Sequence, residues 1–162
     1  MTAEAVIAVC ALGVSLYFGW CMRDHNKKTV KPIPYISPND YEDQIAVRLW
    51  NYGSGPMILK NVLFRHAEKE LSGHLIDIIP NPSCYLCFDN YTKIQPDRAL
   101  LPGAYITLVQ FSIHEDNAQA VKYRDELREF LGNVSGRVNY TDIYNSSFVA
   151  YTRNLEWFQG HK

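Results

Sequence analysis

The sequence has only four cysteines among its 162 residues, and it contains no block of five or more charged residues and no internal repeat. Four cysteines are too few for a disulfide scaffold at this length. The net charge of −1 lacks the basic excess that nucleic-acid binding needs, so we expect no nucleic-acid partner. Aromatic residues make up 13% of the chain, and this content argues against disorder and predicts a packed domain.

Recognisable catalytic motifs are also missing. The sequence has no G-x-S-x-G, H-E-x-x-H, P-loop or G-x-G-x-x-G pattern. Cys84 and Cys87 form a single C-x-x-C, and His66 and His74 do not add a zinc-finger spacing to it. Structural thiols are therefore the favoured interpretation, with metal binding and redox chemistry as alternatives. The polar residues 114–116 are typical of a helix cap, so we expect no enzyme, no cofactor and no metal site.

The longest uncharged run of the chain spans residues 5–22, "AVIAVCALGVSLYFGWCM". Eighteen residues of α-helix extend about 27 Å, close to the hydrocarbon thickness of a bilayer. A cleaved signal peptide would need a positive start and a small-residue cleavage site, but the chain begins with "MTAE" and the run ends in bulky residues. A soluble core helix would need a polar face, which the run lacks. We therefore expect a transmembrane anchor over residues 1–23, with the other two as alternatives.

Four basic residues follow this run directly: Arg23, Lys27, Lys28 and Lys31. Positive flanks stay on the cytoplasmic side of a membrane. We therefore expect a single-pass protein whose N-terminus is outside and whose domain is in the cytosol. The same four side chains are expected to contact lipid headgroups at the membrane surface.

Small residues recur every fourth position within the run, at Ala11, Ser15 and Gly19. This spacing allows two membrane helices to approach closely. Because such residues are common in membrane spans, chance accounts for the pattern about equally well. The expected partners are thus the lipid bilayer and, through this face, further copies of the chain.

The rest of the chain predicts a mainly β domain. Residues 24–40 contain three prolines and predict an extended tether, with an edge strand near 34–37. Alternating or apolar segments predict strands at 44–50, 57–66 (with a bulge near Lys60–Asn61), 71–79, 84–88, 105–113, 136–145 and 146–158. A helical stripe at Ala120, Val121, Arg124, Leu127 and Leu131 predicts one helix over 116–132. We expect an antiparallel β-sandwich over 41–158 and a tail at 159–162.

Three segments resemble a known class of protein. "VRLWNYGSGPMILKNVLFRH" (47–66) is similar to a hairpin of small bacterial single-span membrane proteins that carry an immunoglobulin-like domain. "LPGAYITLVQF" (101–111) and "VNYTDIYNSSFVAYT" (138–152) are similar to the later strands of such domains. The resemblance covers most of residues 34–156. It implies an immunoglobulin-like sandwich with one inserted helix behind a membrane anchor, and it implies no chemical site.

Three functions fit this layout. The first is a membrane-tethered, non-enzymatic binding or scaffold module in a multi-protein bacterial system, which implies a protein partner. The second is a membrane effector of antiviral defence, whose cytosolic domain senses a small nucleotide signal and oligomerises through its span. The third, if the orientation is reversed, is an envelope adhesion or assembly module. Aromatic and arginine side chains are the candidate contacts: Trp50, Tyr52, Trp157 and Phe158 for a protein, and Arg65, Arg98 and Arg137 for a small molecule.

Overall fold

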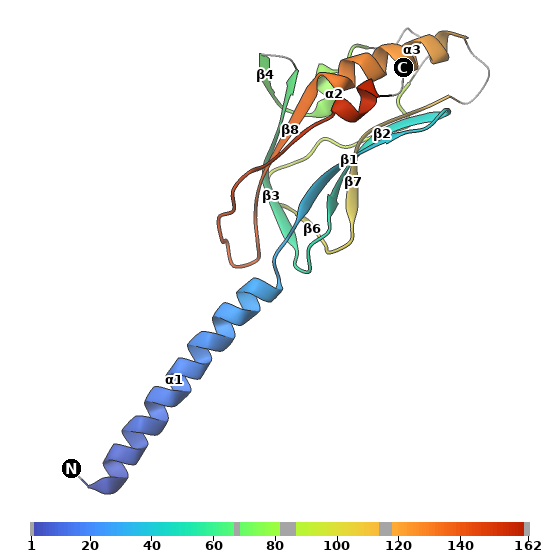
Figure 1. Cartoon of the computed structure of the whole chain (residues 1–162). Coiled ribbons are helices and arrows are strands. Elements are labelled where there is room, and N and C mark those ends of the chain that lie inside the picture. Colours follow the sequence, from blue (N-terminus) through green and yellow to red (C-terminus); the bar gives the residue numbers. More distant parts are fainter. Residues whose placement is uncertain (1, 67–68, 82–86, 114–117, 161–162) are drawn as a thin grey trace.

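The computed structural model of the protein describes residues 2–66, 69–81, 87–113 and 118–160, and it shows one long helix followed by a β domain (Figure 1). The helix, α1 (Ala3–Thr29), is long and apolar enough to cross a membrane, and the domain buries none of its apolar segment. It extends past the predicted anchor of residues 1–23 into the polar residues that follow. An ion pair of 2.7 Å between Asp24 and Lys28, one turn apart, supports this extension.

The first sheet contains the strands β1 (Pro34–Asp40), β2 (Gln44–Asn51), β5 (Asn90–Tyr91) and β7 (Tyr105–Ser112). They are antiparallel and lie in the order β1-β2-β7-β5, and β2 and β7 confirm the strands predicted at 44–50 and 105–113. β1 confirms the edge strand predicted near 34–37 and continues it to Asp40, so the paired strands begin at Pro34, within the range 24–40 that we expected to be a tether. Its prolines are tolerated because β1 is an edge strand, which needs backbone donors on one side only.

The second sheet contains β3 (Met57–His66), β4 (Lys69–Ser72), β6 (Arg98–Leu100), β8 (Val134–Thr141) and β9 (Tyr151–Asn154). Its order is β4-β3-β8-β9, and β6 pairs with the first residues of β3. The pairing of β3 with β8 shifts register between Leu59 and Asn61, which confirms the bulge predicted there. The protein is therefore a mainly β, sandwich-like fold of two antiparallel sheets behind an apolar helix.

The strand predicted at 71–79 is wrong over most of its length. The chain leaves β4 at Ser72 and turns at Gly73, whose φ of +138° is accessible to glycine. It then forms a short helix, α2 (Leu75–Ile78), which buries Leu75 against the core. One turn of helix already directs a large apolar side chain toward the core. This apolar run can therefore pack against the core without the alternating in-and-out pattern of a strand. Of the strand predicted at 84–88, the described residues 87–88 lie in no strand, and the others lie outside the described residues.

The closing strand predicted at 146–158 is much shorter in the structure. Only β9 is extended, and the chain then makes a turn of 3₁₀ helix, η1 (Glu156–Gln159). This turn buries Phe158 and leaves Trp157 exposed. If the strand had continued, these residues would have passed the first residue of β8, because β9 is antiparallel to it. They would then have had no residue of β8 to pair with.

The predicted helix is present as α3 (Ala118–Gly132). Its buried face contains Ala120, Leu127 and Leu131 as predicted, but Tyr123 replaces Val121 on it. The Tyr123 ring meets Phe111 edge-on at 5.1 Å, and its hydroxyl donates to the carbonyl of Pro80 at 2.7 Å. Burial raises the pKa of Tyr123 to about 12, with a further contribution from the nearby charge of Glu126.

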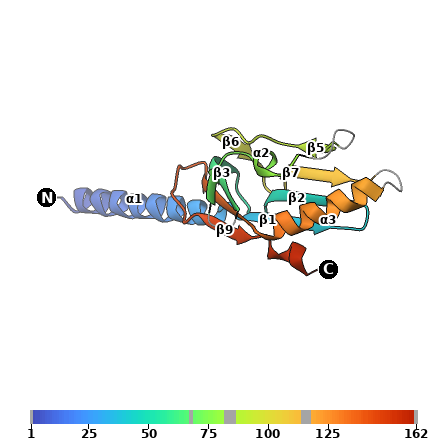
Figure 2. The same ribbon diagram turned by 90° about the horizontal axis from the view of Figure 1, so that it is seen from above.

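The core lies between the two sheets. The inward-facing residues Ile36, Val47, Leu49, Leu59, Phe64 and Val138 belong to it. The sheets approach closely at Gly136, because a Cβ there would lie only 2.7 Å from Cδ1 of Ile36. α3 and η1 cover the end of the domain that is far from α1 (Figures 1 and 2). We call this end, with the β1–β2 turn at 40–43, the distal end.

The opposite end of the domain meets α1, and we call it the proximal end. It consists of the junction at 30–33 and three connections: 52–56 between β2 and β3, 101–104 between β6 and β7, and 142–150 between β8 and β9. Figure 1 shows the β8–β9 connection reaching down toward the end of α1. Two contacts agree with this view, since Nζ of Lys27 and of Lys31 lie 5.8 Å from the ring centroids of Tyr144 and Phe148 respectively.

Candidate functional site

The site begins at the junction between α1 and the sandwich. The amides of Tyr52 and Ser54 donate to the carbonyls of Ile33 and Lys31, at 2.8 and 3.2 Å. Two glycines permit this contact, because a Cβ at Gly53 or at Gly55 would overlap the backbone of residues 30–33. The turn "NYGSGP" is thus explained by what it packs against: the glycines are needed for close backbone approach to the segment that follows the helix.

Asn51 organises this junction from the end of β2. Its side chain is fully buried, and Oδ1 accepts the amides of Ile33 and Gly53 at 3.2 and 3.0 Å. Its Nδ2 donates to the carbonyls of Gly55 and Leu100 at 2.8 and 3.0 Å. One amide side chain therefore satisfies backbone groups from the junction, the β2–β3 turn and β6, which fixes how α1 meets the domain.

Four aromatic rings lie side by side on the outer face of the first sheet. Tyr35, Trp50 and Tyr105 are register partners across β1, β2 and β7, and Tyr52 follows β2. The ring centroids are separated by 5.4 Å for Tyr35–Tyr52, 5.5 Å for Tyr52–Trp50 and 4.5 Å for Trp50–Tyr105. Tyr52 and Tyr105 are 57% and 47% exposed, so the row is accessible to a partner.

An arginine stacks on each end of this row. The guanidinium of Arg153, from β9, lies 4.3 Å from the Tyr35 ring centroid, and that of Arg48, from β2, lies 5.1 Å from Tyr105. Burial alone lowers the pKa of Arg153, but the hydroxyls of Tyr35 and Tyr151 outweigh it and raise the pKa. Nε of Arg48 is buried and has no hydrogen-bond partner among the described residues. We call the six residues Arg153, Tyr35, Tyr52, Trp50, Tyr105 and Arg48 the aromatic ladder.

The structure brings only some of the predicted contact residues together. Trp50 and Tyr52 are both in the aromatic ladder, whereas Phe158 is buried in the distal core. Arg98 pairs with Leu59, and Arg65 lies six positions further along the same strand, about 20 Å away at the rise of a β-strand. Arg65 and Arg98 are exposed on the second sheet and do not converge with each other or with the ladder.

Sequence reasoning missed Tyr105, Arg48 and Arg153 as members of the site. Their outward positions on the strands could be read from alternation, but their proximity depends on strand order and register. Arg153 comes from the other sheet and reaches Tyr35 only because β9 and β1 meet at one side of the sandwich. The sequence contains no local signal for that contact.

The predicted oligomer face of the span is accessible in the structure. Ala11, Ser15 and Gly19 are exposed along one side of α1, and the space where a Gly19 Cβ would lie is open. The hydroxyl of Ser15 donates to the carbonyl of Ala11 at 2.8 Å, within the same helix. Helix pairing through this face stays a prediction.

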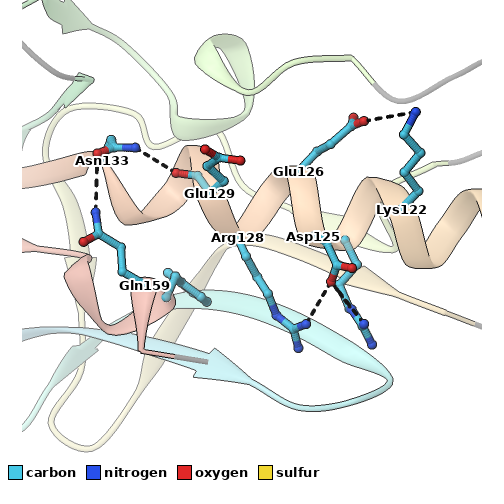
Figure 3. Close-up of a pocket in the computed structure, with 9 residues that line it drawn as sticks. Lys122, Asp125, Glu126, Arg128, Glu129, Asn133 and Gln159 are labelled. Carbon is cyan, nitrogen blue, oxygen red and sulfur yellow. Dashed lines mark hydrogen bonds and ion pairs between the residues drawn. The ribbon is translucent and has the colours of Figure 1, made fainter. Parts of the chain in front are cut away.

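An open groove of about 920 Å³ lies along α3 and η1 at the distal end. Figure 3 shows the side chains that line it. Its charged side chains are of both signs and contact each other: Lys122–Glu126 at 3.8 Å, Arg124–Asp125 at 3.1 Å and Arg128–Asp125 at 3.0 Å. Such mutual pairing gives the groove no preference for an anion or a cation. It is typical of a solvated helix face, and we assign no ligand to it.

Cys87 is exposed, and its C-x-x-C partner Cys84 lies outside the described residues, as does the cluster at 114–116. Within the part of the chain that the structure describes, no group of three potential metal ligands occurs. No protein-family model matches the chain, and no curated protein is similar to it. The geometry of the junction and of the aromatic ladder is therefore the basis on which a function can be inferred.

Proposed function

We propose that the protein is a membrane-anchored, non-enzymatic binding module that acts within a multi-protein bacterial system. In this proposal α1 spans the bilayer, and the sandwich presents the aromatic ladder to a protein partner. The observation that carries it is the ladder itself, a continuous and partly exposed row of two arginines, one tryptophan and three tyrosines. Tryptophan, tyrosine and arginine are the residues that most often dominate protein-binding energy.

The fold that we propose is immunoglobulin-like. The strand orders β1-β2-β7-β5 and β4-β3-β8-β9 support this assignment, because they correspond to the A-B-E-D and C′-C-F-G orders of that fold. In this correspondence, α3 is inserted between the equivalents of strands E and F. Sandwiches of this kind act by presenting faces, edges and loops to partners, which agrees with a ladder on one outer face.

The chemistry of the ladder indicates the kind of segment that it binds. The rings offer flat apolar surface, and the two arginines at the ends offer donors and positive charge. The positive charge of the two guanidinium groups beside Tyr35 and Tyr105 would be complemented by an acidic group of the partner. We therefore expect a partner segment with apolar side chains beside at least one carboxylate.

The nucleotide-sensing effector is less well supported. It requires basic side chains that converge on one pocket. Arg137 lies opposite Leu63, two positions from Arg65, but Arg98 lies opposite Leu59, about 20 Å from Arg65 at the rise of a β-strand. The envelope module would use the same ladder on the other side of the membrane. Only the orientation of the chain in the membrane distinguishes it from the cytosolic module.

A photo-reactive benzoylphenylalanine in place of Tyr52 tests the ladder in cells. We expect one discrete adduct with another protein at this position, and none from the same group at Tyr91, an equally exposed tyrosine on β5. Trp50→Ala should weaken this binding roughly thirtyfold, as expected for a contact worth about 2 kcal/mol. Equal adducts at both positions, or an adduct that persists in a folded Trp50→Ala variant, would contradict the proposal.

A second prediction concerns orientation. With Cys10, Cys21 and Cys84 replaced by serine, the exposed Cys87 is the reporter. We expect a membrane-impermeant maleimide to label it only after the cells are permeabilised, because the basic flank of α1 stays in the cytosol. A cysteine at Thr2 in the same background should be labelled in intact cells. Labelling of Cys87 in intact cells would reverse the orientation and favour the envelope module.

A further inference from the structure

We propose that the proximal end of the domain rests on the headgroup layer of an anionic lipid bilayer. The protein then contacts the membrane in two ways, through α1 and through the connections around its end. This inference depends on the proposed membrane anchor and adds to it a defined posture of the domain. It assigns a role to the β6–β7 and β8–β9 connections, which contribute no residue to the aromatic ladder.

The connection between α1 and the domain is short and hydrogen-bonded. Only the junction at 30–33 separates α1 from β1, and Asn51, Tyr52 and Ser54 all hydrogen-bond to its backbone. The hydroxyl of Ser54 also donates to the carbonyl of Thr29, the last residue of α1. A domain held in this way follows the helix and keeps one face toward the bilayer.

The height of the domain above the bilayer follows from where the uncharged run of α1 ends. The uncharged run ends at Met22, and the helix rises about 1.5 Å per residue, so Lys27 lies only about 6 Å above Arg23. The headgroup layer of each leaflet is itself roughly 5–7 Å thick. Tyr144 reaches back along α1 to this level, where its ring lies 5.8 Å from Nζ of Lys27. The tip of the β8–β9 connection therefore lies at the depth of the headgroups.

The chemistry of the proximal end also suits this posture. Leu101 and Ile143 are 64% and 52% exposed at the tips of two connections. Of the eleven exposed large hydrophobic side chains described after α1, six are at this end: Ile33, Tyr52, Leu101, Ile143, Tyr144 and Val149. The three connections contain one carboxylate, Asp142, which is buried and accepts the amides of Tyr144 and Ser146. Apolar and aromatic tips without exposed acids suit a membrane interface.

Charge is distributed unevenly along the molecule. The distal segments 40–43, 118–133 and 156–159 carry seven carboxylates and three basic side chains. The proximal end has Arg23, Lys27, Lys28 and Lys31 beside it, with Asp24 paired to Lys28 at 2.7 Å. An anionic surface attracts the basic end and repels the acidic end, so the field of the membrane favours the same posture as the apolar tips. This complementarity selects lipid rather than a second copy of the chain, whose proximal end would have the same charge.

The test uses the full chain in vesicles of zwitterionic and anionic phospholipid, with an environment-sensitive fluorophore on a single cysteine. Tyr144→Cys and Ile143→Cys report on the proximal end, and Tyr41→Cys, an exposed tyrosine in the β1–β2 turn, is the matched distal control. Spin-labelled lipids with the nitroxide near the headgroup are the quencher. We expect several-fold stronger quenching at 143 and 144 than at 41.

The native Cys10, kept as the only cysteine and probed with lipids that carry the nitroxide on the acyl chain, separates the two proposals, because it lies in the apolar run of α1. If a label at Cys10 is quenched and labels at 143 and 144 are no more quenched than at 41, the posture is overturned and the anchor stands. If Cys10 is not quenched either, the anchor itself is overturned. The two proximal sites are neighbours with independent side chains, so a folding defect in one variant leaves the other as a valid reporter.

Discussion

Asn51→Ala is expected to lower the free energy of unfolding by about 4 kcal/mol, because it leaves four buried backbone groups without their partner. The groups are the amides of Ile33 and Gly53 and the carbonyls of Gly55 and Leu100. A buried donor or acceptor that loses its hydrogen bond costs about 1–3 kcal/mol, and partial access of water to Ile33 reduces the sum. Urea unfolding of the full chain in detergent micelles, followed by tryptophan fluorescence, measures the change.

The matched control is Asn61→Ala, which removes the same side chain from the exposed bulge of β3. We expect it to change the free energy of unfolding by less than about 0.5 kcal/mol. Asn51→Asp sharpens the test, since the carboxylate still accepts both amides but cannot donate to Gly55 and Leu100. Loss of stability no greater in Asn51→Ala than in Asn61→Ala would show that the junction does not depend on this side chain.

The junction also shows where sequence reasoning was limited. The dense turn residues at 51–56 correctly predicted a turn, and the glycines and the asparagine were visible in the sequence. The hairpin that the resemblance implied over 47–66 is wrong, because β2 and β3 belong to different sheets and do not pair with each other. What they pack against was not, because the residues they contact, 30–33, were expected to belong to a tether. Contacts between segments about twenty positions apart leave no periodic signal. The same limit applies to β1: the edge strand predicted near 34–37 continues through Pro38 to Asp40, because its pairing with β2 sets where it ends.

The candidate site was predicted in part for a related reason. Alternation along β2 placed Trp50 on the outer face, and β7 was the clearest predicted strand. The ladder, however, requires Tyr35, Trp50 and Tyr105 to be in register, and register is set by the order β1-β2-β7 rather than by any one strand. Arg65 and Arg98 show the opposite case. Both are basic and exposed, yet their positions along β3 and β6 keep them apart, so residue type alone did not predict a shared pocket.

Asp40→Ala is the second substitution with a large expected effect, and it acts at the distal end. The Asp40 side chain is 1% exposed, and its carboxylate accepts three hydrogen bonds of 2.7–3.0 Å from the guanidinium of Arg128. This pair joins the end of β1 to α3. Removing one partner of a buried ion pair costs about 3–5 kcal/mol, because the other charge is left without compensation. We expect about 3 kcal/mol here, since Arg128 is 17% exposed and keeps a contact of 3.0 Å with Asp125.

Two companion variants identify the cause of that loss. Glu126→Ala breaks the exposed Lys122–Glu126 pair on the same helix and should cost about 0.3 kcal/mol at most. Asp40→Ala combined with Arg128→Met removes the uncompensated charge, so the double variant should be more stable than Asp40→Ala alone. If the double variant is instead less stable by the sum of two independent losses, the pair contributes through packing rather than charge. The Asp40–Arg128 pair is at the far end of the domain from α1, so the quenching of a label at Tyr144→Cys should persist in the Asp40→Ala variant. This result would show that the junction and the proximal contacts alone set the orientation of the domain on the membrane.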